Sequence, residues 1–229
     1  MPRARKTLYF ELLVTVGLMV IPALIRAVFH FLHPEEPLFR PIYASWYFAG
    51  TIVFELLLIG LLWHIIRLNS EVLADFTQPF AGKDLLRGLG LSIWASMSEY
   101  GTRRFLWSLG VGVVEAGKEP RAIEAFQVPL SAFYLLTMLV NPFFEEFLVR
   151  GFLQTRLRQA ACSGLAVILV STALQTSYHL YQGILFCLAL APGFLVFAVY
   201  YHTSRRLWPV VVAHLILDLV AMLFLVNSN

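Results

Sequence analysis

The sequence predicts an all-α protein that crosses a membrane repeatedly, a polytopic transmembrane bundle of about seven helices. Three observations lead to this prediction. Hydrophobic residues make up 59% of the 229 residues, charged residues make up only 14%, and the mean hydropathy is +0.74. One soluble core cannot hide so much apolar surface, so lipid is the expected solvent. The apolar residues also lie in long runs separated by short polar connections, as expected for successive membrane-spanning helices.

The predicted spans follow one another along the chain. The first, from Leu8 to about Leu32, contains Pro22 and should be kinked by it, because a proline inside a helix removes a backbone hydrogen bond. The third, about Leu85 to Val114, is interrupted by Glu99 and Arg103, whose i,i+4 spacing favours a helical ion pair. The remaining spans are expected at about 45–66, 128–158, 164–180, 184–201 and 208–226.

The basic residues indicate how the chain is oriented. Cytoplasmic loops are enriched in Lys and Arg, and a cytoplasmic N-terminus places ten basic residues inside and three outside. The inside set is Arg3, Arg5, Lys6, Arg67, Lys83, Arg87, Arg156, Arg158, Arg205 and Arg206, and the outside set is Arg40, Lys118 and Arg121. The net charge is +3, but these residues form no basic stripe, so no nucleic-acid partner is expected. No linker divides the chain, so residues 1–229 are expected to form a single multi-pass integral membrane domain.

One stretch, Asn141 to Gln154, places two adjacent carboxylates and an arginine within an apolar, helical pattern. Each charged group at membrane depth costs about 2.5–3.5 kcal/mol to insert, so such groups usually pair or mark function. Glu146 and Arg150 are four residues apart and can pair along one helix face, whereas Glu145 is rotated by about 100° from Glu146. We therefore expect Glu146 and Arg150 to be supporting residues and Glu145 to be reactive.

Three further polar residues, His179, His214 and Asp218, lie in similarly apolar surroundings. With a rise of about 1.5 Å per residue, Glu145 lies about 17 Å and His179 about 22 Å from the expected cytoplasmic helix ends. His214 and Asp218 lie about 14 and 20 Å from theirs, on one helix face. A lone buried histidine is more often structural, but shared depth with a carboxylate favours a site. The sequence thus predicts a catalytic cluster on the fourth, fifth and seventh helices, open to a cavity on the cytoplasmic side.

These residues carry a resemblance to a known family. The sequence Glu-Glu-Phe-Leu-Val-Arg at 145–150, then His179, then His-Leu-Ile-Leu-Asp at 214–218 resemble the motifs EExxxR, FxxxH and HxxxN/D. These motifs belong to the CAAX protease and bacteriocin-processing family, also called CPBP or Abi. Its members are intramembrane glutamic endopeptidases related to the type II CAAX prenyl endopeptidase. The resemblance covers about Val128 to Val226, and Gln175 stands where the family usually has Phe.

The resemblance implies roles for the residues that match the motifs. It implies that Glu145 and His179 activate the water that attacks the scissile carbonyl, and that His214 and Asp218 act on the oxyanion. An ionised Asp218 would repel an oxyanion, so it must be protonated or must orient His214. The implied partners are the lipid bilayer and a peptide or membrane-protein substrate, CAAX-type peptides among them, and no cofactor is implied.

Two other interpretations stay open at this point. Two histidines and a carboxylate could form a zinc site with water as the fourth ligand, although the chain lacks an HExxH arrangement. The family also includes scaffold and immunity proteins, and a buried polar cluster can simply hold helices together. A transporter is less favoured, because the sequence has no inverted repeat.

Overall fold

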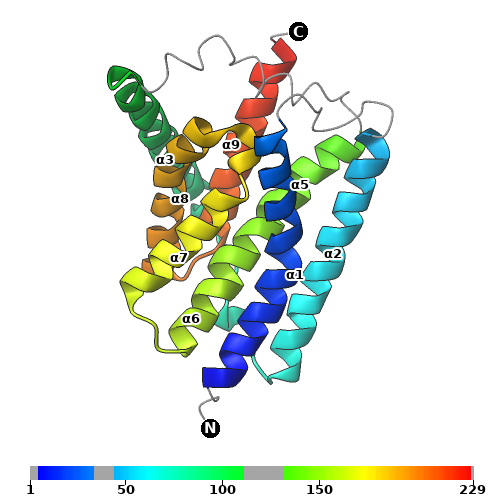
Figure 1. Ribbon diagram of the computed structural model, residues 1–229. Helices are drawn as coiled ribbons and strands as arrows, with labels where there is room; N and C mark the ends of the chain where they lie inside the picture. The colour runs from blue at the N-terminus through cyan, green and yellow to red at the C-terminus, as the bar shows by residue number, and fades with distance from the viewer. Residues whose placement is uncertain (1–4, 34–43, 111–131, 228–229) are drawn as a thin grey trace.

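A computed structural model describes residues 5–33, 44–110 and 132–227, and all regular secondary structure in these ranges is helical. Figure 1 shows long helices packed side by side as a bundle, with the two ends of the chain at opposite ends of it. The predicted all-α class is confirmed. Arg3, Arg40, Lys118 and Arg121, which the orientation argument used, lie outside the described residues.

Two helices and a long tilted third form the first half of the chain. They are α1 (Arg5–Leu32), α2 (Ala44–Leu68) and α3 (Lys83–Ser108), with a short helix η2 (Leu73–Asp75) between α2 and α3. The halves of α1, Lys6–Leu18 and Val20–Phe29, meet at an angle of 42°. Pro22 lies four residues after Leu18, whose carbonyl its ring would contact in a straight helix, so the predicted kink is present. In α3 the predicted ion pair between Glu99 and Arg103 also forms.

The helix that carries the two adjacent glutamates changes its winding part-way. It begins as α5 (Ala132–Glu146), continues as a π-helical segment η3 (Phe147–Gln154) and ends as α6 (Thr155–Gln159). The sequence predicted a plain α-helix that ends near Arg158, so the end agrees and the interior differs, and the predicted start near Val128 lies outside the described residues. All eight residues of η3 are buried, and π-helical turns are frequently found at functional sites.

The second half contains α7 (Gly164–Ser177), the short helix η4 (Leu180–Gln182), α8 (Ile184–Ser204) and α9 (Trp208–Asn227). The predicted fifth span extended to Leu180, but α7 ends earlier, so His179 lies in the turn before η4 and not inside a helix. After η4, Gly183 adopts a φ of 97°, which a glycine tolerates, and redirects the chain into α8.

The helices surround the buried η3 segment. α5 packs against α2 and α9, α7 packs against α8, and α3 crosses both α8 and α9. The crossing of α3 and α9 is close at Gly88, where an added Cβ would lie 2.5 Å from a methyl of Val212. Any larger residue at Gly88 would force these two helices apart.

Three described helices are long and apolar enough to cross a membrane: Trp46–Leu68, Ala132–Gln159 and Ile184–Ser204. The two halves of α1 would make a fourth span if they are taken together. α7 and the apolar part of α9 are shorter. Most helical segments therefore lie where the sequence predicted them, but α3 ends at Ser108, earlier than the predicted end near Val114, which lies outside the described residues. The number of full spans stays a prediction.

Candidate active site

Glu146, the last residue of α5, is fully buried and connects three helices. Its Oε1 accepts a hydrogen bond of 2.8 Å from Gln175 Nε2 on α7 and lies 2.9 Å from Nδ1 of His214 on α9. Its Oε2 lies 3.4 Å from Nε of Arg150. Arg150 in turn donates from Nη2 to the carbonyl oxygen of Phe194 on α8, at 3.0 Å. The ion pair expected from the i,i+4 spacing is therefore present, and it is anchored to α7, α8 and α9.

Glu145 points to a different set of partners and is only partly buried. Its Oε2 accepts a hydrogen bond of 2.8 Å from the hydroxyl of Tyr178, which follows α7 directly. The same oxygen lies 3.4 Å from Nε2 of Gln175. The two adjacent carboxylates thus differ in the way the helix geometry predicts: Glu146 is enclosed by an arginine, an amide and a histidine, while Glu145 receives only neutral donors among the described contacts.

His179 is held in one orientation by its own turn of backbone. Its Nδ1 lies 2.8 Å from the carbonyl oxygen of Gln175. A carbonyl oxygen only accepts hydrogen bonds, so Nδ1 carries the hydrogen and Nε2 of the neutral ring is the acceptor. The ring packs beside Tyr178 and Phe194, each with its ring centroid 4.9 Å away. His179 therefore presents a basic nitrogen next to the tyrosine that holds Glu145.

His214 lies between two carboxylates. Its Nδ1 faces Glu146, and its Nε2 lies 3.7 Å from Oδ1 of Asp218, whose side chain is 25% exposed. The 3.7 Å separation is too long for a hydrogen bond, although the two residues share a face of α9 as expected. The close partner of His214 is thus Glu146, a contact that the sequence did not predict. Glu146 orients this histidine as well as pairing with Arg150.

One network therefore joins the polar residues that the sequence singled out. It runs from His179 and Glu145 through Gln175 to Glu146, and from there to Arg150 and His214. Asp218 lies at its edge. The residues come together from α5, η3, α7 with the turn that follows it, and α9. The chemical role of each residue stays a prediction.

Sequence reasoning missed several residues of this region. Glu55 of α2 is 3% exposed, and its Oε1 accepts a hydrogen bond of 2.8 Å from Asn141 Nδ2, one helical turn before Glu145. A lone carboxylate inside an apolar run was a usable signal, because its insertion cost applies as much there as at Glu145. Gln175 was noted only as a departure from a motif, and Tyr178 gave no signal, since an aromatic residue is ordinary in a membrane helix.

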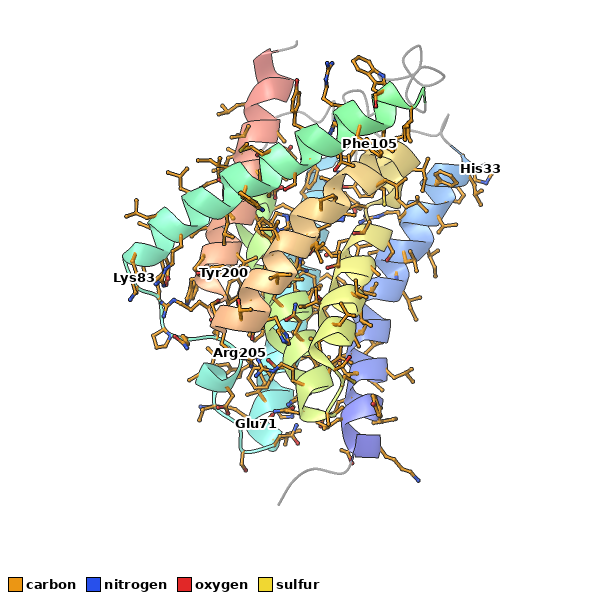
Figure 2. All side chains as sticks on the ribbon, turned by 90° about the vertical axis from the view of Figure 1, so that its left-hand side faces the viewer. His33, Glu71, Lys83, Phe105, Tyr200 and Arg205 are labelled. Atoms are coloured by element: carbon orange, nitrogen blue, oxygen red, sulfur yellow. The ribbon has the colours of Figure 1, made fainter. Side chains whose placement is uncertain are left out.

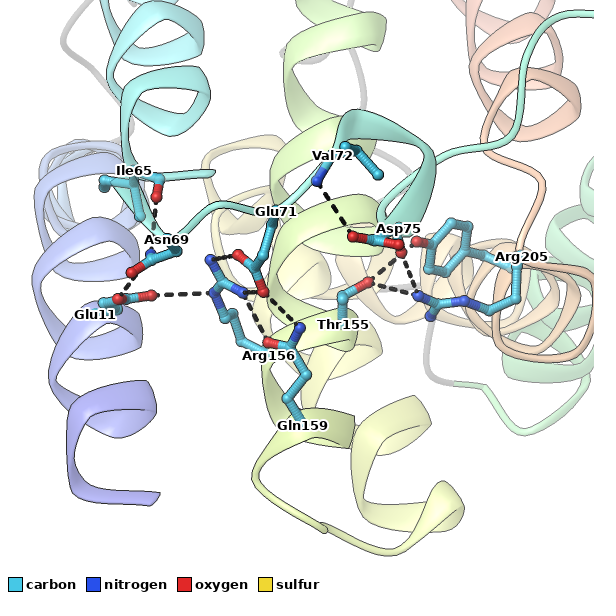
Figure 3. A network of polar contacts seen from close by, with 11 residues as sticks. Glu11, Ile65, Asn69, Glu71, Val72, Asp75, Thr155, Arg156, Gln159 and Arg205 are labelled. Atoms are coloured by element: carbon cyan, nitrogen blue, oxygen red, sulfur yellow. Dashed lines mark hydrogen bonds and ion pairs between the residues drawn. The ribbon is translucent and has the colours of Figure 1, made fainter. Parts of the chain in front are cut away.

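A second polar cluster lies further along the same helix (Figure 3). Arg156 of α6 is fully buried, and both its Nη atoms bond the carboxylate of Glu71 at 2.8 Å. Its Nε lies 3.1 Å from Glu11 of α1. The guanidinium also lies 5.0 Å and 4.8 Å from the ring centroids of Phe76 and Phe152. In this way α1 and the chain after α2 are both tied to the helix that carries the glutamates.

Metal ligation was the alternative role for the histidines. In the part of the chain that the structure describes, no three His, Cys, Asp or Glu side chains are grouped as metal ligands. Nδ1 of both His179 and His214 faces an oxygen acceptor. Histidines that bind a metal through Nε2 usually donate Nδ1–H to a carbonyl or a carboxylate, so this geometry does not decide between the zinc interpretation and the glutamate interpretation.

Comparison with known families connects this network to an activity. The sequence model of the family described as "Type II CAAX prenyl endopeptidase Rce1-like" matches residues 127–220. The match covers less than half of the chain, and it supports membership of the chain in this family. The Rce1-like segment contains the whole network described above, and the family implies a peptidase. Together with three or more helices that are long and apolar enough to cross a membrane, the match supports an integral membrane protease of the CAAX type. Searches of curated proteins and of solved structures give no match.

Proposed function

We propose that the protein is an intramembrane glutamic endopeptidase in which Glu145 activates the attacking water. The observation that supports this most is the contrast between the two adjacent carboxylates. Glu146 is fully buried and bonded to Arg150, Gln175 and His214. Glu145 is partly exposed and held by Tyr178, so it can meet both water and a peptide.

In this mechanism Glu145 removes a proton from the water while the water oxygen forms a bond to the scissile carbonyl carbon. The carbonyl electron pair moves to the oxygen, which becomes an oxyanion. His179 assists through Nε2, the nitrogen that is left to accept a proton when Nδ1 donates to the backbone. When the oxyanion collapses, the C–N bond breaks, and the proton taken from the water passes to the leaving amine.

His214 is the proposed donor to the oxyanion. Glu146 binds its Nδ1 and so fixes the direction of the ring, with Nε2 on the opposite side. A doubly protonated His214 would donate Nδ1–H to Glu146 and present Nε2–H to the oxyanion. Asp218, at 3.7 Å from Nε2, then serves to orient the ring and does not touch the oxyanion itself.

The orientation, substrate and cofactor requirement belong to the same proposal. We infer a cytoplasmic N-terminus and a site reached from the cytoplasm, because the positive residues favour that side. The described charged residues Glu71 and Arg205 lie at the end of the bundle that carries the N-terminus, and His33 and Phe105 lie at the other (Figure 2). The substrate is a peptide or membrane protein, CAAX-type sequences among them, and no metal takes part.

The test is cleavage of CAAX-type and unmodified peptides by the purified protein in lipid. Glu145→Gln keeps the size of the side chain and removes the base, so activity should fall at least about 100-fold while the unfolding temperature is kept. Glu99→Gln, at the partly exposed pair on α3, is the control and should be fully active. Full activity of Glu145→Gln would overturn the proposal. Loss of activity on chelation with return on adding zinc would favour the metal alternative, and absence of any cleavage would favour a scaffold.

A further inference from the structure

Gln175 contacts both motif carboxylates. It is fully buried on α7, one helical turn before His179. Its amide nitrogen has two hydrogens and lies 2.8 Å from Oε1 of Glu146 and 3.4 Å from Oε2 of Glu145. An amide group is planar and its two N–H bonds diverge at a fixed angle. The side chain can therefore hold two carboxylates that point in different directions at a set separation.

The backbone of Gln175 holds the ring of His179. Its carbonyl oxygen accepts the hydrogen from Nδ1 of His179 and so determines which ring nitrogen can take a proton. Through Glu146, the amide is also one contact away from His214. Gln175 is thus the link in the described network between the proposed base, Glu145 with His179, and the proposed oxyanion donor, His214.

The side chain expected at this position in the family motif cannot make these bonds. A phenylalanine would fill similar space beside the carboxylates, but it has no N–H to donate. Adjacent carboxylates would then be held by their own rotamers and by their other partners. This chain has an amide where the motif has a ring, so the difference alters how the two sides of the site are held relative to each other.

We propose that Gln175 is a positioning residue that sets the distance between the water-activating side and the oxyanion side of the site. The inference rests on the proposed function, because it assigns those two sides to Glu145 and His214. A shift of about 1 Å between reacting groups can cost on the order of 100-fold in rate. The effect should therefore fall on kcat, since substrate binding does not require the two sides to be aligned.

The chain contains a matched control for this glutamine. Gln154 of η3 is also fully buried, and its amide nitrogen donates to Ser171 Oγ at 2.9 Å and to the Ala198 carbonyl at 3.2 Å. Ser171 lies on α7 one turn before Gln175. Gln154 therefore also donates two interhelical hydrogen bonds from a buried amide, but its acceptors are neutral and it bonds neither glutamate.

The experiment compares Gln175→Met, Gln175→Phe and Gln154→Met in the peptide assay, with the unfolding temperature of each. We expect kcat to fall about 10- to 100-fold in both Gln175 variants with KM within about 3-fold of the starting value. Gln154→Met should lower the unfolding temperature by a similar amount and leave kcat within about 3-fold. Gln175→Phe guards against misfolding, because it is the residue that the motif itself carries.

Two results would overturn the inference while the proposed function stands. One is a Gln175→Phe variant with the original kcat, and the other is an equal loss of kcat in the Gln154 and Gln175 variants. Glu145→Gln is measured in the same assay to separate the two proposals. If that variant stays active, the proposed function fails and the role of Gln175 fails with it.

Discussion

Arg150 and Arg156 lie on the same continuous helix and are both fully buried, yet they have different surroundings. Arg156 makes two bonds of 2.8 Å to Glu71, an ion pair of 3.1 Å to Glu11, and packs against two phenylalanine rings. Arg150 has one carboxylate at 3.4 Å and one carbonyl, and its Nη1 makes no hydrogen bond to the described residues.

The difference separates a structural charge from one that serves a site. Arg156 is bonded to carboxylates that also accept hydrogen bonds from Asn69 and Gln159 and that contact none of the motif histidines in the described network, so this cluster is expected to be structural. Arg150 shares Glu146 with an amide and a histidine, and its carboxylate partner therefore keeps part of its bonding capacity for His214. Buried ionic groups of the first kind hold segments together, whereas those of the second kind orient neighbours that can react.

The largest expected effect is that of replacing Arg150, the arginine that serves the site. Arg150→Met leaves Glu146 buried without its cation, so the free energy of unfolding should fall by about 3–5 kcal/mol. Activity should also be lost in the folded fraction, because Glu146 would no longer hold His214 in place. Chemical unfolding in mild detergent, together with peptide cleavage by the folded fraction, measures both. A variant that is unstable but fully active would mean that Arg150, like Arg156, is only structural.

Arg156→Met should lower stability without lowering the activity of the folded protein. Its partners, Glu71 and Glu11, have side chains 15% and 14% exposed, so they can regain some contact with water. We therefore expect a loss near the lower end of the range for a broken buried pair, about 3 kcal/mol. The same two measurements apply. A loss of kcat in the folded Arg156→Met protein would show that α6 affects the site, and Arg156 would then not be purely structural.

The third prediction tests whether Asp218 only orients His214 or takes part in binding a metal. If it only orients His214, Asp218→Asn should keep activity within about 3-fold or raise it, because Glu146 still holds the ring through Nδ1 and the neutral amide removes a charge that could repel the oxyanion. Chelation should leave both proteins unchanged. An inactive Asp218→Asn variant, together with a stoichiometric metal in the purified protein, would favour the zinc alternative over the glutamate mechanism.

Much of the fold could be predicted because hydrophobic runs and prolines act locally. The helical segments, the kink at Pro22 and the pairing of Glu146 with Arg150 all follow from spacing along one helix. The π-helical segment after Glu146 could not be predicted, since its residues have an ordinary helical pattern. The sequence placed the end of the fifth helix at Leu180, three residues after the end of α7, because residues 178–180 contain no glycine or proline that would indicate an earlier end.

The residues of the site were easier to predict than the contacts between them. Depth along each helix indicated which polar residues share a layer, and it grouped Glu145 with His179 and His214. Rotation about each helix decides which of them touch, and this depends on packing between α5, α7 and α9. The bond from His214 to Glu146 and the bridging amide of Gln175 are therefore invisible in the sequence, as is Glu55, which comes from a helix outside the family match.

The smallest expected effect concerns a third charged cluster, which resembles that of Arg156. Asp84, at the start of α3, is fully buried and receives two bonds from Arg206, at 2.8 and 2.6 Å, in the loop before α9. Hydrogen bonding from Arg206 lowers the pKa of Asp84 below its ordinary value. A depressed pKa means that the pair contributes stability at neutral pH and down to the ordinary Asp value near 4, and that this contribution is lost as the pH falls further, through the folded pKa.

Asp84→Asn should therefore lower the unfolding temperature at pH 7, and the difference from the unaltered protein should close below about pH 4. Thermal unfolding between pH 7 and pH 3 measures this difference in unfolding temperature. Glu99→Gln is the control, and its unfolding temperature should stay close to that of the unaltered protein because the ion pair of Glu99 is partly exposed. A difference that stays constant down to pH 3 would mean that the charge of Asp84 does not stabilise the fold.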